Sequence, residues 1–192
     1  MSRKTYMTAV VVIPPLDLWP PIQAIRHEHD RQARRWMPHI NLIYPFRPRE
    51  EFEFLAGQFS RVCKGIEPFE IKLKEFFFFR HGQDCYTLWL VPEPKETLIK
   101  LQALLWSVVP DCDEGRTYEG GFTPHLSVGQ ARGQTAMLRL LNMLQVSWKT
   151  LVFTVNEVSL IWRGNPPNDV FRVVCTVRLG KQNLKHANFV TV

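Results

Sequence analysis

The sequence of 192 residues lacks several features that would assign it to a common class. No uninterrupted apolar run approaches the ~20 residues that a membrane-spanning helix needs. Neither a G-x-x-x-x-G-K-[ST] loop nor a G-x-G-x-x-G loop is present. These absences argue against a membrane-spanning protein and against the glycine-loop classes of nucleotide-binding proteins.

Cysteine is also scarce, and its spacing is uninformative. The four cysteines are separated by long, irregular gaps, and none forms a C-x-x-C pair. Neither a zinc site nor a disulfide framework is therefore expected. We expect reduced thiols, no metal ion and a cytoplasmic or nuclear location. The cysteines are Cys63, Cys85, Cys112 and Cys175.

The composition is that of a globular protein with a basic excess. The hydrophobic fraction is 45% and the charged fraction is 22%, which argues against disorder, collagen and coiled coil. The chain carries 24 Lys and Arg against 18 Asp and Glu, a net charge of +6. Such an excess suits a polyanionic partner such as RNA, although many basic proteins bind none.

Hydrophobic periodicity predicts strands and helices that are interspersed along the chain. Alternation and short apolar runs predict strands, whereas apolar spacings of three and four predict helices. The order indicates an α+β or α/β class. A single domain of residues 1–180 is expected, followed by a tail of residues 181–192 without a clear pattern. The predicted strands are 6–13, 39–43, 69–79, 85–91, 124–128, 151–161 and 170–179, and the predicted helices are 22–35, 50–63, a segment after Pro94 through 105, and 135–145.

The sharpest local signal is a pair of matching segments. Residues 36–42 read WMPHINL and residues 122–128 read FTPHLSV. Both follow the pattern aromatic-x-Pro-His-aliphatic-polar-aliphatic. The two histidines, His39 and His125, lie about half the chain apart, as an internal duplication with two pseudo-symmetric lobes would require.

Strand geometry predicts what the two segments present. Residues two apart share one face of a strand, so His39 lies with Asn41 and His125 lies with Ser127. With an ordinary pKa of ~6.5, one imidazole can accept a proton and a second can donate one. The neighbouring amide and hydroxyl can hydrogen-bond to phosphate oxygens. This set suits metal-free phosphodiester chemistry with a bell-shaped pH dependence.

The two segments resemble the paired His-aliphatic-[Thr/Ser]-aliphatic motifs of the 2H phosphoesterase superfamily, which includes 2′-5′ RNA ligase-like proteins and cyclic nucleotide phosphodiesterases. The resemblance implies a two-lobed, pseudo-symmetric α+β fold with antiparallel sheets lining a central cleft. It also implies a 2′,3′-cyclic-nucleotide phosphodiesterase that needs no metal or cofactor and yields 2′-phosphates. In this reading His125 activates water, His39 protonates the leaving oxygen, and Asn41 and Ser127 hold the phosphate. The implied partners are RNA ends or nucleotide 2′,3′-cyclic phosphates, bound by a monomer.

Asn41 departs from the family pattern, which usually has Thr or Ser at this position. An amide can still donate to a phosphate oxygen, but its reach differs from that of a hydroxyl. Two alternatives stay open, and Asn41 motivates the second of them. One is a 2′-5′ or 3′-5′ oligonucleotide phosphodiesterase, and the other is a nucleotide- or RNA-binding module with little turnover.

Aromatic and basic residues near the motifs have two interpretations each. Tyr44 and Phe46 could stack on a base or pack in the core. Trp162 and Arg163 could contact a nucleotide or close a hairpin. The six arginines between positions 26 and 49 could attract phosphates or form a solvated helix face.

Two further segments are expected to be structural. His81 precedes a glycine in a turn and is expected to be incidental, and the run Phe76–Phe79 is expected to belong to the core. The loop 118–121 precedes the second motif, and its glycines could admit a substrate or simply permit a turn.

Overall fold

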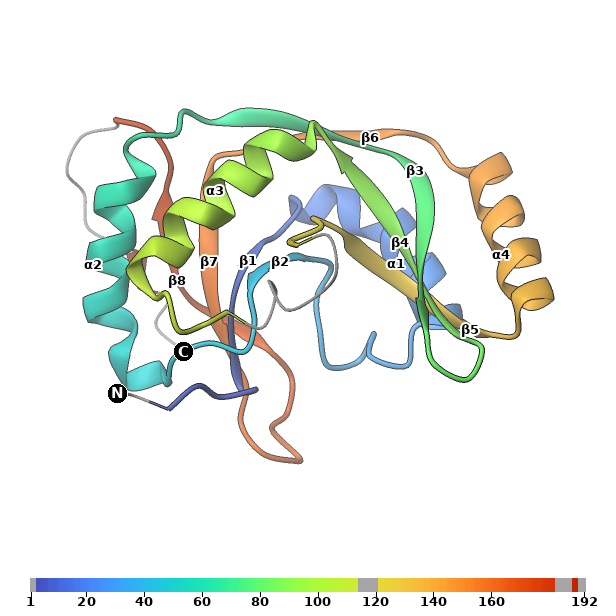
Figure 1. The fold of residues 1–192 in the computed structure, drawn as a ribbon, viewed down its shortest axis with the longest axis horizontal. Helices are drawn as coiled ribbons and strands as arrows, with labels where there is room; N and C mark the ends of the chain where they lie inside the picture. Colours follow the sequence, from blue (N-terminus) through green and yellow to red (C-terminus); the bar gives the residue numbers. More distant parts are fainter. Residues whose placement is uncertain (1–2, 114–120, 182–187, 190–192) are drawn as a thin grey trace.

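The computed structural model describes residues 3–113, 121–181 and 188–189 (Figure 1). Helices and strands are interspersed along these ranges, which confirms the α+β class. The strands are β1 (Thr8–Val12), β2 (Ile40–Ile43), β3 (Phe69–His81), β4 (Cys85–Glu93), β5 (Leu126–Arg132), β6 (Leu151–Val155), β7 (Glu157–Trp162), β8 (Arg172–Arg178) and β9 (Asn188–Phe189), and the helices are α1 (Trp19–His29), α2 (Phe52–Cys63), α3 (Lys95–Val108) and α4 (Gln134–Ser147).

The strands form two antiparallel sheets. One sheet has the order β2-β1-β7-β8-β9, and the other has the order β5-β4-β3-β6. The units β1-α1-β2 and β4-α3-β5 are equivalent, because each places its last strand at the edge of its own sheet. The two histidine motifs therefore precede the two matching edge strands.

The helices extend this pseudo-symmetry by crossing between the sheets. Helix α1 follows β1 of the first sheet but packs against β5 of the second. Helix α3 follows β4 of the second sheet but packs against β2 of the first and against α2. Helix α4 packs against β3 and β5, at the opposite end of the molecule from α2 (Figure 1). The expected two-lobed fold is confirmed.

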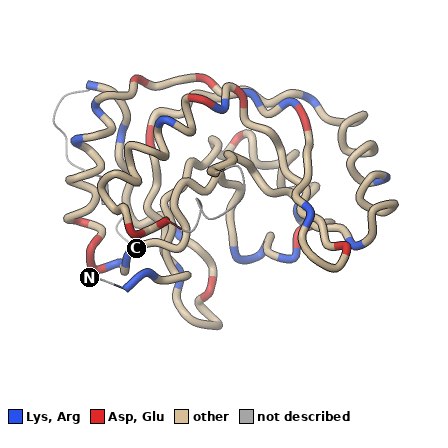
Figure 2. Tube along the Cα trace, viewed as in Figure 1, with Lys and Arg blue, Asp and Glu red and all other residues tan. Residues whose placement is uncertain are grey.

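One hydrophobic cluster connects both sheets and the helices. Helix α2 contributes Phe52, Leu55, Ala56 and Phe59, whose spacings of three and four place them on one buried face. Acidic and basic residues are interspersed over both lobes (Figure 2). None of the helices in the described ranges combines the length and hydropathy that crossing a bilayer requires.

The predicted strand 151–161 is wrong as a single element. It consists of β6, which pairs with β3, and β7, which pairs with β1 and β8 in the other sheet. The residues that join the main hydrophobic cluster are Phe153 and Val155 before Asn156, and Val158 and Leu160 after it, while Ile161 is buried in the smaller cluster on the other face of β7. The alternation changes phase at Asn156, so the chain crosses between sheets there.

Two other boundaries differ from expectation. Helix α1 ends at His29 rather than near Arg35, because Asp30 is extended and its carboxylate accepts the backbone N–H of Gln32 at 2.9 Å. Within the expected tail, Asn188–Phe189 forms β9 beside β8. Residues 182–187 and 190–192 lie outside the described residues.

Candidate active site

The two edge strands that follow the histidines meet where the sheets approach each other. Strands β2 and β5 are in contact, and a cleft of about 630 Å³ opens beside them. Both lobes contribute to its walls. The lining residues are Asn41, Leu42, Tyr44, Phe79, Arg80, His81, Thr87, Gly121, Phe122, Thr123, His125 and Ser127.

Both histidines hold the same tautomer. Nδ1 of His39 lies 2.7 Å from the carbonyl oxygen of Met37, and Nδ1 of His125 lies 2.8 Å from that of Thr123. Since a carbonyl oxygen only accepts, each Nδ1 must carry the proton, and each neutral ring keeps its lone pair on Nε2. The partner carbonyl lies two residues before the histidine in both motifs, so the duplication extends to hydrogen bonding.

Aromatic rings surround both imidazoles, in different ways. The His39 ring stacks on Trp36 at 4.5 Å between centroids. The His125 ring meets Phe79 and Trp89 edge-on, at 4.9 and 5.8 Å. Each imidazole ring is thus held by contacts with aromatic side chains and by a hydrogen bond to a backbone carbonyl.

Burial is the largest influence on the pKa of each of the two imidazoles. It lowers the pKa of His39 to about 4, and the positive charge of Arg26 and the nearby His125 act in the same direction. The carbonyl of Met37 and the carboxylate of Asp30 oppose it. Burial also lowers the pKa of His125. Both imidazoles are therefore neutral near pH 7, and a bound phosphate would favour protonation of one of them.

The two polar residues of the motifs line the cleft with His125, whereas His39 is not among the lining residues. Asn41 lies opposite Val11 on β1, and Ser127 lies opposite Trp89 on β4. The side-chain oxygen of Asn41 is buried without a hydrogen-bond partner. A phosphate oxygen accepts hydrogen bonds, so the group of Asn41 that can bind one is the Nδ2 donor of the same amide rather than this oxygen.

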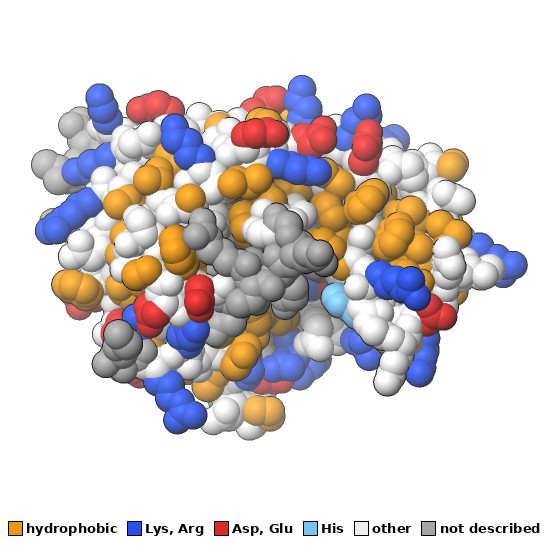
Figure 3. All heavy atoms as spheres, viewed as in Figure 1, with side chains coloured by type: hydrophobic (Ala, Val, Ile, Leu, Met, Phe, Trp, Pro, Cys, Tyr) orange, Lys and Arg blue, Asp and Glu red, His pale blue; other side chains and the backbone are white. Residues whose placement is uncertain are grey.

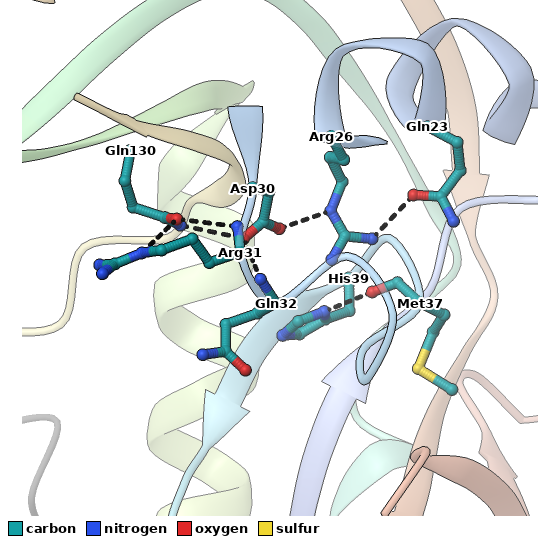
Figure 4. A network of polar contacts seen from close by, with 8 residues as sticks. All are labelled: Gln23, Arg26, Asp30, Arg31, Gln32, Met37, His39 and Gln130. Carbon is teal, nitrogen blue, oxygen red and sulfur yellow. Dashed lines mark hydrogen bonds and ion pairs between the residues drawn. The ribbon is translucent and has the colours of Figure 1, made fainter. Parts of the chain in front are cut away.

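A buried polar network lies next to His39 (Figure 4). Nε of Arg26 donates to Asp30 at 2.9 Å, and both side chains are almost completely buried. Nε2 of Gln130 donates to the same carboxylate at 2.9 Å, while the backbone N–H of Arg31 donates to Gln130 at 3.0 Å. Because Gln130 is on β5 and Asp30 caps α1, these hydrogen bonds connect β5 to the C-terminal end of α1.

The two aromatic residues after the first motif lie in different environments. Tyr44 lines the cleft, and its hydroxyl donates to the carbonyl of Tyr6 at 3.4 Å. Phe46 is completely buried against Phe52 and Phe59, so the prediction that its ring binds substrate is wrong. The core interpretation holds for Phe46 because α2 covers it.

Trp162 and Arg163 are not among the residues that line the cleft. The Arg49 guanidinium covers the Trp162 ring at 4.7 Å, and the ring packs against the main core. Arg163 lies over Phe171 at 5.6 Å and donates to the carbonyl of Gly164 at 3.1 Å. The hairpin interpretation therefore fits both residues better than nucleotide contact.

The arginines near the first motif do not form one phosphate-attracting patch. Arg26 is buried, and Arg34 and Arg35 both pair with Asp169. On the face shown in Figure 3, Lys and Arg side chains are spread around the periphery.

The sequence analysis missed the contribution of β3 to the cleft. Phe79, Arg80 and His81 line it, although the first was expected in the core and the last was expected to be incidental. The missed signal is the length of β3, which continues past Phe79 to His81. Of the glycine loop before the second motif, Gly121 lines the cleft, and residues 118–120 lie outside the described residues.

The cleft offers donors for phosphate oxygens rather than a set of metal ligands. Among the described residues, no three His, Cys, Asp or Glu side chains gather as a metal centre needs. Imidazole, amide and hydroxyl groups meet instead, and each can donate a hydrogen bond to an anionic oxygen.

Comparisons with known proteins agree with this architecture. The sequence matches the family described as the 2′-5′ RNA ligase superfamily over residues 14–167. A comparison with curated proteins finds no match. TT0787 of Thermus thermophilus superposes with a TM-score of 0.62 at 17% identity, over 92% of this chain and 100% of that one.

Two structures of LigT from E. coli are also similar. The complex with phosphate gives a TM-score of 0.57 at 15% identity, over 93% of this chain and 100% of LigT. The complex with 3′-AMP gives 0.54 at 13% identity with the same coverage. At these identities the likeness concerns the fold.

Proposed function

Because the chain belongs to the 2′-5′ RNA ligase superfamily, a group of 2H phosphoesterases, we propose that it hydrolyses 2′,3′-cyclic phosphates of RNA ends or nucleotides to 2′-phosphates. The observation that carries the proposal is the duplicated imidazole geometry. His39 and His125 each have Nδ1 held by the carbonyl two residues earlier, so each presents Nε2 as the reactive nitrogen.

The reaction needs one proton accepted and one donated. Nε2 of a neutral histidine takes a proton from water while the water oxygen forms a bond to phosphorus. The bond from phosphorus to O3′ breaks, and Nε2 of the second, protonated histidine gives O3′ its proton. The product is a 2′-phosphate with a free 3′-hydroxyl. Exchange with solvent then restores both rings.

The carbonyl bonds fit both roles. A neutral ring and an imidazolium can each donate from Nδ1, so neither Met37 nor Thr123 has to move during turnover. Asn41 and Ser127 hold the non-bridging oxygens, where negative charge must be stabilised. LigT was solved with phosphate and with 3′-AMP, which supports a phosphate- and nucleotide-binding cleft in this fold.

The direct test is incubation of the protein, with EDTA present, with nucleoside 2′,3′-cyclic phosphates and a short RNA ending in one. We expect EDTA-resistant formation of 2′-phosphates. His39→Ala and His125→Ala should each lower kcat by about 10²–10⁴-fold, the usual contribution of one proton transfer. His27→Ala is the matched control, because His27 is exposed on α1 away from the cleft.

Near-normal turnover in both the His39→Ala and the His125→Ala variant would overturn the mechanism. If no cyclic end reacts, cleavage of 2′-5′ and 3′-5′ oligonucleotides is the next assay, and binding without product would favour a binding module.

The resemblance assigns His125 as base and His39 as acid, and a change of leaving group tests this order. A 3′-deoxynucleoside 2′-(4-nitrophenyl phosphate) keeps phosphorus on O2′, as the proposed reaction does, and releases nitrophenolate in place of O3′, which needs no proton. The His39→Ala variant should therefore recover on this substrate, whereas His125→Ala should not. Recovery of His125→Ala alone would reverse the assignment.

A further inference from the structure

The cleft continues beyond the catalytic histidines along strand β3. The His125 ring lies 4.9 Å from the Phe79 ring. His81 is two residues further on the same face, roughly 7 Å along the strand at the usual rise. Thr87 pairs with Phe79 on β4, and its Oγ1 lies 3.0 Å from Nε2 of His81. These side chains all line the same cleft as Asn41 and Ser127.

The charge at this end of the cleft favours an anion. Arg80 lines the cleft beside His81, and none of the described lining residues is acidic. Arg80 pairs with the carboxylate of Asp84, and its Nη2 lies 3.6 Å from Oδ1 of Asp84. Both side chains are well exposed. Such an exposed pair is weak, so the guanidinium can turn toward a stronger anion. The hydroxyl of Tyr86 also donates to Asp84 at 3.3 Å, which helps hold the carboxylate if Arg80 leaves it.

The volume of the cleft leaves room for a second phosphate beside the cyclic one. A volume of about 630 Å³ lies within the usual range for small-ligand sites and exceeds what one cyclic phosphate occupies. The rise of roughly 7 Å from Phe79 to His81 is comparable to the separation of adjacent phosphates in an extended nucleic-acid strand. The group between the two ends is an aromatic ring, on which a base or ribose can rest.

We propose that Arg80, His81 and Thr87 form a second anion-binding subsite, which holds the phosphate next to the cyclic one, so that the preferred substrate is an RNA end rather than a mononucleotide. The proposal rests on the proposed function for its catalytic readout. Arg80 and His81 donate to the non-bridging oxygens of an unreactive phosphodiester, and Thr87 orients His81.

Three substrates isolate the charge of that phosphate. They are a nucleoside 2′,3′-cyclic phosphate, a dinucleotide ending in the same group, and that dinucleotide with a neutral methylphosphonate linkage. The wild-type protein should prefer the charged dinucleotide to the neutral one by about 10- to 100-fold in kcat/KM, as one or two charge-assisted hydrogen bonds provide. Arg80→Gln combined with His81→Ala should bring this ratio close to one.

Matched controls come from exposed residues outside the cleft. Arg139→Gln on α4 and His27→Ala on α1 remove the same side-chain types and should leave the ratio unchanged. Equal kcat/KM for the charged and neutral dinucleotides in the wild-type protein, or an unchanged ratio in the double variant, would overturn the proposal.

A binding measurement separates this proposal from the proposed function. Titration calorimetry with the two dinucleotides, each ending in an unreactive 3′-phosphate, measures the same charge preference without turnover. If no cyclic phosphate is hydrolysed but the charged dinucleotide still binds at least 10-fold more tightly, the proposed function fails and the subsite stands. Equal dissociation constants for the two dinucleotides would remove the subsite whatever the activity.

Discussion

The imidazole of His39 makes the stability of this protein depend on pH. Burial lowers the pKa of His39 from 6.5 to about 4, so between these values the unfolded chain binds a proton that the folded protein excludes. The free energy of unfolding therefore falls as the pH falls through this window. At 1.36 kcal/mol for each tenfold difference, the full contribution is roughly 3 kcal/mol.

Urea unfolding at pH 7 and pH 4.5 measures this contribution. The wild-type protein should lose about 2 kcal/mol more than the His39→Gln variant over this interval, because the variant has no imidazole to protonate. His27→Gln serves as the control, since His27 is exposed. Parallel losses in the wild-type protein and in His39→Gln would contradict the assignment.

Asn41 gives a second prediction for a single residue. Its amide is the motif's donor in the first lobe, so Asn41→Ala should lower kcat by about 10²–10³-fold, as loss of one oxyanion donor does. Asn41→Ser restores a hydroxyl and should lie within about tenfold of the wild-type rate. Steady-state kinetics of both variants, with the exposed Asn142→Ala as control, make the comparison. A fully active Asn41→Ala variant would exclude Asn41 from phosphate binding.

The sequence predicts the motif residues but not the rest of the cleft, for a physical reason. The histidines, Asn41 and Ser127 occur in a duplicated local pattern, whose period of two is readable without a structure. Phe79 and His81 reach the cleft only because β3 pairs with β4 over nine positions and β4 with the strand after His125. The pairing of β4 with β5 joins parts of the chain that are far apart in sequence, so it leaves no mark in a window of a few residues.

Between elements, helix α1 and strand β5 approach each other closely at Gly129. A Cβ atom at Gly129 would lie 2.7 Å from Cβ of His29 and 3.1 Å from its carbonyl oxygen. Gly129→Ala therefore forces the two elements apart and should destabilise the protein by about 1–3 kcal/mol. The measurement is urea unfolding at pH 7.

Gly57 on α2 is the matched control for this substitution. It is exposed in a helix, and nothing lies within 4 Å of the position of an added Cβ. Gly57→Ala should stabilise the protein by about 0.5–1 kcal/mol, because alanine loses less conformational entropy in a helix. If both variants lose stability alike, close packing is not the reason for glycine at position 129.

Element types were predictable where periodicity is strong, and boundaries failed where tertiary structure decides them. The pattern of α2 is readable because its buried residues recur every three or four positions. The crossing at Asn156 is visible only as a change in which positions face the main core, and a single strand predicted over residues 151–161 overlooks it. Strand β9 has two residues and depends on pairing with β8, so no local sequence pattern predicts it.

For the whole molecule, the crossed helices make the two lobes depend on each other. Helix α1 belongs in sequence to the first sheet but packs against β5, and α3 belongs to the second sheet but packs against β2. The main hydrophobic cluster includes residues from both sheets. The duplication in sequence predicts two similar lobes, but it cannot predict this exchange, because the packing partner of each helix lies in the other half of the chain.

This interdependence predicts a single cooperative unfolding transition. Native-state amide hydrogen exchange should give β1 and β4 the same free energy of global opening, although they belong to different sheets. Gln130→Ala removes the side chain that joins β5 to Asp30 at the end of α1, and it should lower both values together by about 1–3 kcal/mol. Exposed Gln134→Ala, at the start of α4, is the control. Loss of protection in β4 alone would mean that the two lobes open separately. In that case the packing of α1 and α3 against the opposite sheets would not be what fixes the positions of the two histidines.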